Sequence, residues 1–141
     1  MADQRPVSEI LPRLSLFADL TAAQIEEVVH RFEEEVFAQG ARILRKGLRG
    51  SGVFIILEGE AAIRIDGTEV TRFGAGEFFG EISVVTGEPP NADVEALTLL
   101  RCLQIPGPEF HKFATEHPRV LFRMFQAEAR RLRDTTAWKV S

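Results

Sequence analysis

Residues 73–94 read FGAGEFFGEISVVTGEPPNADV, a stretch in which glycines separate short apolar runs. Gly80 permits a close approach of the backbone because glycine has no Cβ, and residues 81–85 can form a single helical turn. Exposed N–H groups at the start of such a turn create a ready site for an anion. Glu81 stands at that opening and would repel a bare phosphate, but a carboxylate accepts a hydroxyl strongly. The stretch therefore indicates a ligand that carries a hydroxyl beside its phosphate, as a ribose phosphate does.

The glycines continue outward from this stretch on its N-terminal side. Of the 11 glycines in the chain, all but Gly107 lie between residues 40 and 87. Helices avoid glycine because of its backbone entropy, so this density predicts many short strands and tight turns. Residues 62–65 alternate apolar and polar before Asp66-Gly67, a pair that suits a two-residue hairpin turn, and residues 94–105 give another strand pair. Closely spaced short strands of this kind are typical of a β-sandwich or barrel.

Helical signals flank the glycine-rich region on both sides. Thr21-Ala-Ala-Gln24 is a capping box, in which the threonine hydroxyl and the glutamine side chain satisfy exposed backbone donors. Apolar residues then follow with the period of a short helix, namely Ile25, Val28, Val29 and Phe32. Pro108 opens a short helix and Pro118 a longer one, at a first-turn position that proline tolerates. The longer helix is predicted to have an apolar face made of Leu121, Met124, Phe125, Ala129 and Leu132.

Three motifs give the chain a resemblance to a known family. They are LFADLT at residues 16–21, GVFIILEGEA at residues 52–61 and GEFFGEIS at residues 76–83. The sequence resembles the cyclic-nucleotide-binding domain found in catabolite activator protein, the protein kinase A regulatory subunits and cyclic-nucleotide-gated channels. The resemblance implies a mainly β fold, an eight-stranded β jelly-roll barrel with flanking α-helices. It divides a single domain, residues 1–141, into N-terminal helices (1–34), a barrel (35–106) that contains the phosphate-binding cassette (78–94), and C-terminal helices (107–141).

The same resemblance implies a ligand and a set of residues that bind it. In this reading Gly80, Ile82 and Ser83 lie against a cyclic phosphate, and Glu81 takes the ribose 2′-hydroxyl. The ligand would be cAMP or cGMP, and no other cofactor or metal is expected. The predicted ligand-binding residues are Phe79, Gly80, Glu81, Ile82, Ser83, Asn91 and Ala92.

One departure from the family pattern bears on affinity. The family cassette continues Gly-Glu-Pro-Arg, and its arginine pairs with the phosphate, whereas this chain has Pro90 at that position and Asp93 shortly after it. A charge-assisted hydrogen bond contributes about 1.5–3 kcal/mol, and loss of one partner of a buried charge pair costs about 3–5 kcal/mol. Affinity should therefore be lower by roughly ten- to several-thousand-fold. We expect a small regulatory sensor domain that binds a cyclic nucleotide weakly.

Several alternatives stay open at this stage. The glycine-rich stretch can be only a turn of the barrel, in which case the chain is a degenerate, ligand-free domain that serves as a protein-interaction or dimerisation module. Trp138 can cap a purine base or lie on the surface. The last helix can pack on its own barrel or pair with a second copy, so the expected partners include a homodimer through that helix or a regulated partner protein.

Other functions have little support in the sequence. No catalytic motif is present, the three histidines are scattered, and tyrosine is absent, so we do not expect an enzyme. A net charge of −4 gives no general attraction to nucleic acid or to anionic membranes. Cys102, the only cysteine, lies in an apolar run and is interpreted as a buried, inert thiol. With no secretion signal and no apolar run of membrane-spanning length, we expect a cytoplasmic protein.

Overall fold

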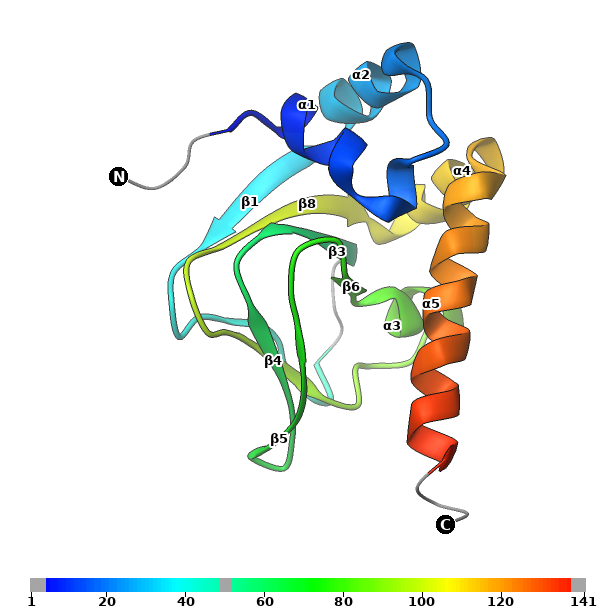
Figure 1. Cartoon of the computed structure of the whole chain (residues 1–141). Helices are drawn as coiled ribbons and strands as arrows, with labels where there is room; N and C mark the ends of the chain where they lie inside the picture. The colour runs from blue at the N-terminus through cyan, green and yellow to red at the C-terminus, as the bar shows by residue number, and fades with distance from the viewer. Residues whose placement is uncertain (1–4, 49–51, 138–141) are drawn as a thin grey trace.

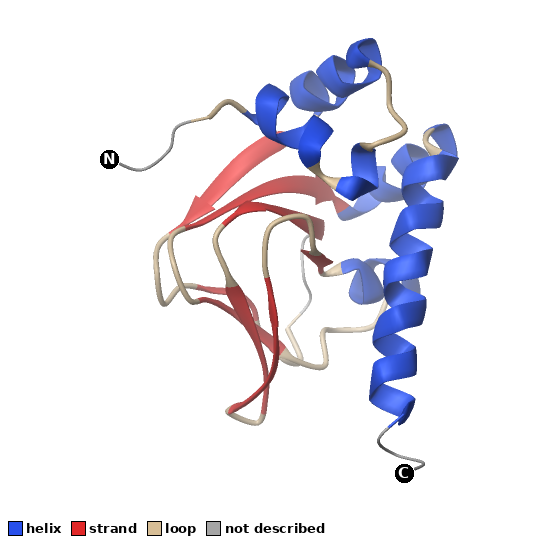
Figure 2. Ribbon diagram, viewed as in Figure 1, coloured by secondary structure: helices blue, strands red, loops and turns tan. Residues whose placement is uncertain are grey.

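Two antiparallel sheets of four strands each form the centre of the molecule (Figures 1 and 2). The structure is a computed structural model that describes residues 5–48 and 52–137. One sheet has the order β1-β8-β3-β6 and the other β2-β7-β4-β5. The strands are β1 (Glu33–Phe37), β2 (Arg42–Leu44), β3 (Gly52–Glu58), β4 (Ala61–Ile65), β5 (Thr68–Phe73), β6 (Phe78–Phe79), β7 (Asp93–Ala96) and β8 (Leu100–Pro106). The predicted jelly-roll of eight strands with flanking helices is confirmed.

Strand β3 shows why the sequence forms two layers of core. Its residues Val53, Ile55 and Leu57 pack into a cluster with the helices, whereas Phe54 and Ile56 point into the space between the two sheets. Successive side chains of a strand face opposite sides of the sheet. An uninterrupted apolar run therefore fits a strand that is buried on both faces. Cys102 lies in the inter-sheet cluster, buried as predicted.

The β4–β5 hairpin forms where the sequence predicts it. Asp66 and Gly67 have φ angles of 51° and 83°, so both central residues of the turn are left-handed. This is the arrangement of a type I′ turn, whose twist matches that of the flanking strands. The hairpin forms one edge of its sheet, and its tip is the part of the barrel farthest from the N-terminal helices (Figure 1).

A layer of short helices covers the outer face of the first sheet (Figure 2). It contains α1 (Val7–Ile10), η1 (Leu11–Arg13), η2 (Ser15–Phe17) and α2 (Ala22–Arg31). The capping box at the start of α2 is present, with the Gln24 backbone N–H donating to the Thr21 hydroxyl and the Thr21 N–H donating to the Gln24 side chain. Strand β1 begins at Glu33, two residues before the predicted start of the barrel, because pairing with β8 extends to Gln104.

The C-terminal helices α4 (Gly107–Glu116) and α5 (Pro118–Ala137) follow β8, and α5 runs down the side of the barrel past the short helix α3 (Glu81–Thr86) (Figure 1). The sequence left open whether the predicted apolar face of α5 packs on the barrel, and most of that face does not. Val120 and Met124 are buried, whereas Leu121, Phe125 and Leu132 are exposed. The side of α5 that faces the barrel also carries Arg131, which donates a hydrogen bond to the Phe78 carbonyl of β6. Trp138 lies outside the described residues.

Within residues 5–48 and 52–137, no helix combines the length and the apolar character needed to span a bilayer.

Candidate ligand-binding site

Gly80 sets the geometry of the site at the point where β6 ends and α3 begins. Its φ angle is +90°, a left-handed conformation that favours glycine, and it is the N-cap of α3. A Cβ at this position would lie 2.3 Å from the carbonyl oxygen of Gly52, far inside contact distance. Because no other residue fits here without displacing β3, the chain can turn abruptly from the barrel into α3 only at a glycine.

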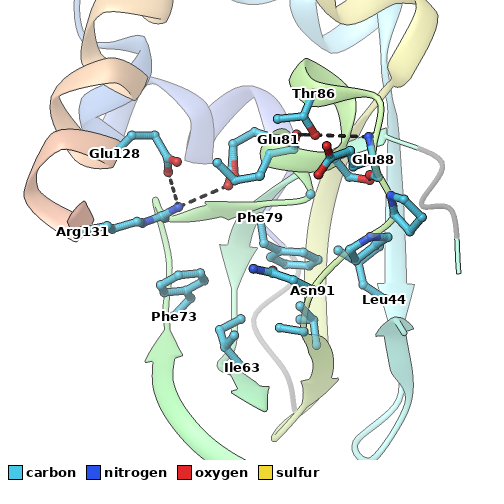
Figure 3. A pocket seen from close by; sticks show the side chains of 17 residues that line it. Leu44, Ile63, Phe73, Phe79, Glu81, Thr86, Glu88, Asn91, Glu128 and Arg131 are labelled. Atoms are coloured by element: carbon cyan, nitrogen blue, oxygen red, sulfur yellow. Dashed lines mark hydrogen bonds and ion pairs between the residues drawn. The ribbon is translucent and has the colours of Figure 1, made fainter. Parts of the chain in front are cut away.

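A cavity of about 250 Å³ opens beside α3 (Figure 3). Its wall includes all of the predicted ligand-binding residues, Phe79, Gly80, Glu81, Ile82, Ser83, Asn91 and Ala92. The inner end is apolar and comes from the barrel, through Leu44, Ile63, Phe73 and Val94. Residues 88–92 form the rim, and α5 supplies Glu128 and Arg131 on the remaining side. The structure thus brings the predicted set together around one cavity, while the role of each residue toward a ligand stays a prediction.

The rim of the cavity is held by hydrogen bonds to its neighbours. The Ser83 hydroxyl donates to the carbonyl oxygen of Glu88, which ties α3 to the start of the rim. The backbone N–H of Gly47 donates to the Pro90 carbonyl at 2.9 Å. Asp93 accepts the backbone N–H of Lys46 at 2.7 Å and is not part of the cavity wall. The acidic group at position 93 therefore holds the chain that follows β2 rather than facing the cavity.

Glu81 and Arg131 form the polar centre of the site. The Glu81 side chain is buried, and its Oε1 lies 3.3 Å from Nη1 of Arg131. The same Nη1 lies closer to Glu128, at 2.6 Å from Oε1, and Nη2 donates to the Phe78 carbonyl at 2.9 Å. The guanidinium carbon also stands 4.2 Å and 4.4 Å from the ring centres of Phe73 and Phe78. Arg131 thus forms ion pairs with two carboxylates, and its N–O distance to Glu128 is shorter than that to Glu81.

Glu81 is left incompletely satisfied by this arrangement. Its second oxygen, Oε2, is buried and finds no hydrogen-bond partner among the described residues. Burial and the neighbouring Glu128 carboxylate raise the pKa of Glu81 to about 7, although Arg131 and the backbone N–H groups of Glu81 and Ile82 act in the opposite direction. A buried acceptor without a partner is costly to leave unpaired. Glu81 lines the cavity, and its Oε2 is a buried acceptor that lacks a donor among the described residues.

Inspection of the sequence did not identify Arg131, which lies in a basic run with Arg130 and Arg133. A signal was present, however. Val120, Met124, Ala127 and Arg131 follow one another at spacings of four, three and four residues, which places them on one face of a helix. The first two are buried and Ala127 packs against the core, so the arginine at the end of this series points toward the barrel.

Comparison with known proteins places the chain in a family. The profile described as "Cyclic nucleotide-binding domain" matches residues 34–117, more than half of the chain. The chain belongs to this family. The matched region of this cyclic nucleotide-binding domain extends from β1 to the end of α4 and contains the complete predicted cassette.

Individual relatives agree with this assignment. The domain is 30% identical over 112 residues to a cyclic nucleotide-gated potassium channel of Rhizobium etli, a match covering 79% of this chain and 31% of the channel. Its fold is similar to catabolite activator protein of Thermus thermophilus, with a TM-score of 0.76, 23% identity, and coverage of 86% and 60% of the two chains. It is also similar to the regulatory subunit of a cAMP-independent protein kinase A from Trypanosoma brucei, with a TM-score of 0.70, 26% identity, and coverage of 84% and 45%.

The cyclic nucleotide-binding domain spans about a third of three curated relatives that it matches, with coverage of 31%, 34% and 29% of their lengths. The match therefore covers only part of each of these relatives.

Proposed function

We propose that this domain binds a cyclic nucleotide, cAMP or cGMP, in the cavity beside α3, and that it binds weakly. The observation that carries the proposal is the buried Oε2 of Glu81, an acceptor without a partner among the described residues, in a side chain that lines the cavity. A ribose hydroxyl is a donor of the kind that this atom lacks. We expect the domain to act as a regulatory sensor in the cytoplasm, with no catalytic step of its own.

The shape and the chemistry of the cavity support this proposal. Its apolar inner end, with Phe73 and Phe79 beside Ile63, suits the flat surface of a base or the carbon face of a sugar. The polar side offers the Asn91 amide and the start of α3. The family arginine is replaced by Pro90, which lines the rim and has no charge or N–H to offer. The expected affinity is therefore lower by the ten- to several-thousand-fold that the loss of one charged partner implies, at about 1.4 kcal/mol per tenfold.

Calorimetry with cAMP and cGMP, each at millimolar concentration, tests the proposal directly. We expect saturable binding, together with a rise in melting temperature, because a ligand that binds only the folded state stabilises it. Ala92→Trp should abolish both effects by filling the cavity. Ala75→Trp is the matched control, because Ala75 is not part of the cavity wall. Absence of heat and of stabilisation for both nucleotides would exclude the sensor function.

A second candidate, a homodimerisation module, is favoured by a separate observation on α5. Its outer face carries Leu121, Phe122, Phe125 and Leu132, which are 42% to 68% exposed. Pro118, Phe122, Phe125, Ala129 and Leu132 recur at alternating intervals of four and three residues. That spacing is the seam of a two-helix coiled coil, in which a second copy of the same helix covers the apolar stripe. The similar kinase regulatory subunit described as cAMP-independent is a precedent for this fold without cAMP control.

Sedimentation equilibrium separates this candidate from a monomeric sensor. We expect the chain to dimerise and the double variant Phe122→Ser/Phe125→Ser to be a folded monomer, because both side chains lie on the exposed stripe. Leu99→Ser, which removes an exposed apolar side chain elsewhere on the surface, should leave the dimer intact. A wild-type chain that remains monomeric at high protein concentration would rule out the α5 interface.

A further inference from the structure

The charges around the cavity are unusual for a site that receives an anion. Among the described residues, its wall carries three carboxylates, those of Glu81, Glu88 and Glu128, and one guanidinium, that of Arg131. The guanidinium is already engaged by Glu81, by Glu128 and by the Phe78 carbonyl. Pro90 occupies the place of the family arginine. On the described part of the wall, no cation is therefore left to neutralise a phosphate.

Two effects of opposite sign decide which form of Glu81 an anionic ligand prefers. Like charges about 6 Å apart, at an effective dielectric constant of about 20, repel by an amount equivalent to roughly a hundredfold in affinity. Against this, a hydroxyl donates more strongly to a carboxylate than to a neutral carboxyl group, by roughly tenfold at most. Without an arginine on the phosphate the repulsion is the larger effect. An anionic ligand should bind better when Glu81 is neutral.

The surroundings of Glu81 allow that neutral form. On α5, Glu81 faces Arg131 and Glu128, which carry opposite charges. The Phe78 carbonyl of β6 accepts a hydrogen bond from the same guanidinium. Glu88, on the rim, lines the same cavity. The buried Oε2 has room for a proton because nothing described bonds to it. A protonated carboxyl still offers one donor and one acceptor, so it can still bond a ribose hydroxyl.

We propose that a proton on Glu81 takes the place of the missing cassette arginine, so that an anionic cyclic nucleotide binds together with a proton. The proposal rests on the proposed function. It follows from the orphaned buried oxygen, the two carboxylates that share one guanidinium, and the proline in the cassette. The consequence is a ligand affinity that rises as the pH falls.

The pKa of about 7 for Glu81 in the empty site gives the pH range of the effect. A bound anion raises the pKa of Glu81 further, so the complex holds the proton to higher pH than the empty domain does. Linkage then requires affinity to decrease as pH rises from about 6 to about 8, by roughly five- to tenfold if the bound anion raises the pKa by about one to two units. Cyclic AMP itself keeps one negative charge throughout this range.

Calorimetric titration of the intact chain with cAMP, repeated across this pH range, is the primary test. Titration at about pH 7.5 in two buffers of different ionisation enthalpy should show uptake of between about half a proton and one proton per ligand bound. Glu81→Gln should bind with an affinity that no longer depends on pH, and at about pH 8 at least as tightly as the wild type. Glu109→Gln is the matched control, because Glu109 is exposed on α4, and should behave as the wild type.

Two further measurements make the test specific. Pro90→Arg restores a cation for the phosphate and should flatten the dependence of affinity on pH. The fold of Glu81→Gln is checked through its stability. The folded-state pKa of about 7 lies above the ordinary value of 4.5, so wild-type stability should fall as pH rises through that interval. Glu81→Gln should remove this fall, leaving the variant more stable than the wild type above neutral pH.

The outcomes separate the two levels of the proposal. Binding that weakens with rising pH and loses this dependence in E81Q supports proton coupling. Binding that strengthens with pH, or an E81Q variant that binds more weakly at every pH, means that Glu81 acts as an ionised acceptor, and proton coupling is wrong while the sensor function stands. A pH dependence that persists in E81Q assigns it to another group and overturns the proposal. No binding at any pH refutes the sensor function as well.

Discussion

Pro90→Arg should increase the affinity of the domain for cAMP by at least tenfold and by as much as several-thousand-fold at neutral pH. The lower value corresponds to one charge-assisted hydrogen bond of about 1.5 kcal/mol, and the upper value to a well-desolvated charge pair of about 5 kcal/mol. Pro90 lines the cavity, and its carbonyl accepts the Gly47 N–H, a contact that an arginine backbone can keep. Calorimetry of the wild type and the variant under identical conditions gives the ratio.

Pro90→Gln is the control for this prediction. It removes the proline ring and adds a polar side chain of moderate length, but it brings no charge. We expect at most a small gain in affinity for Pro90→Gln, because a neutral hydrogen bond contributes only about 0.5–1.5 kcal/mol. If Pro90→Arg bound cAMP no better than the wild type, the phosphate would not lie against this part of the rim, and the alignment of the cassette would be wrong.

Arg131→Ala should release the C-terminal half of α5, which contains Glu128 and Arg131, from the barrel. The substitution leaves Glu81 and Glu128 without their shared cation and removes the stacking on Phe73 and Phe78. Loss of one partner of a buried charge pair costs about 3–5 kcal/mol. Because the Arg131 side chain is 26% exposed, we expect a smaller loss, about 2–4 kcal/mol, above neutral pH. Urea denaturation measures it.

Hydrogen exchange shows where that loss is located. The N-terminal half of α5 keeps Val120 and Met124 buried in the core. It also keeps the ion pair between Arg123 and Asp19, with an N–O distance of 2.7 Å. Exchange should therefore accelerate mainly in the turns around Glu128, by roughly 30- to 700-fold if the full cost appears as local opening. Arg130→Ala is the matched control, since Arg130 is the neighbouring arginine and is exposed. Equal effects of the two substitutions would mean that Arg131 does not hold the helix.

The pairing of Glu81 with Arg131 also connects the cavity to the position of α5. In the proposed complex a ligand hydroxyl bonds to Glu81, the carboxylate that Arg131 of α5 also contacts. Arg131 also donates to the Phe78 carbonyl and lies over the rings of Phe73 and Phe78, so the helix can stay attached to the barrel while Glu81 changes its partner. If the proposed function holds, we expect substitutions of Glu81, Glu128 and Arg131 to alter the response of α5 to a ligand.

The local elements of the fold could be predicted from short stretches of sequence. The Asp66-Gly67 turn, the Thr21–Gln24 capping box and the helical turn after Gly80 depend on residues within a few positions of one another. Their physical causes are the permitted φ angles of glycine and the hydrogen bonds of short polar side chains to the nearby backbone. The seven predicted site residues came from the resemblance to the cyclic-nucleotide-binding domain, and they line one cavity within the stretch from β6 to β7.

The role of Arg131 and the inner face of α5 depended on the tertiary structure. The helix has apolar residues on more than one face, so its pattern alone could not distinguish the face of Val120 and Met124 from the face of Phe122 and Phe125. What decides the rotation is the contact of α5 with η2, α4 and the barrel, partners that include segments far away along the chain. The sequence alone determined the turns, caps and alternating strands, because these follow from neighbouring residues. Only the tertiary structure decided that Glu81 shares Arg131 with Glu128, a helix residue 47 positions later in the sequence. The reason is that the energy of a buried charge depends on which distant groups the fold brings beside it.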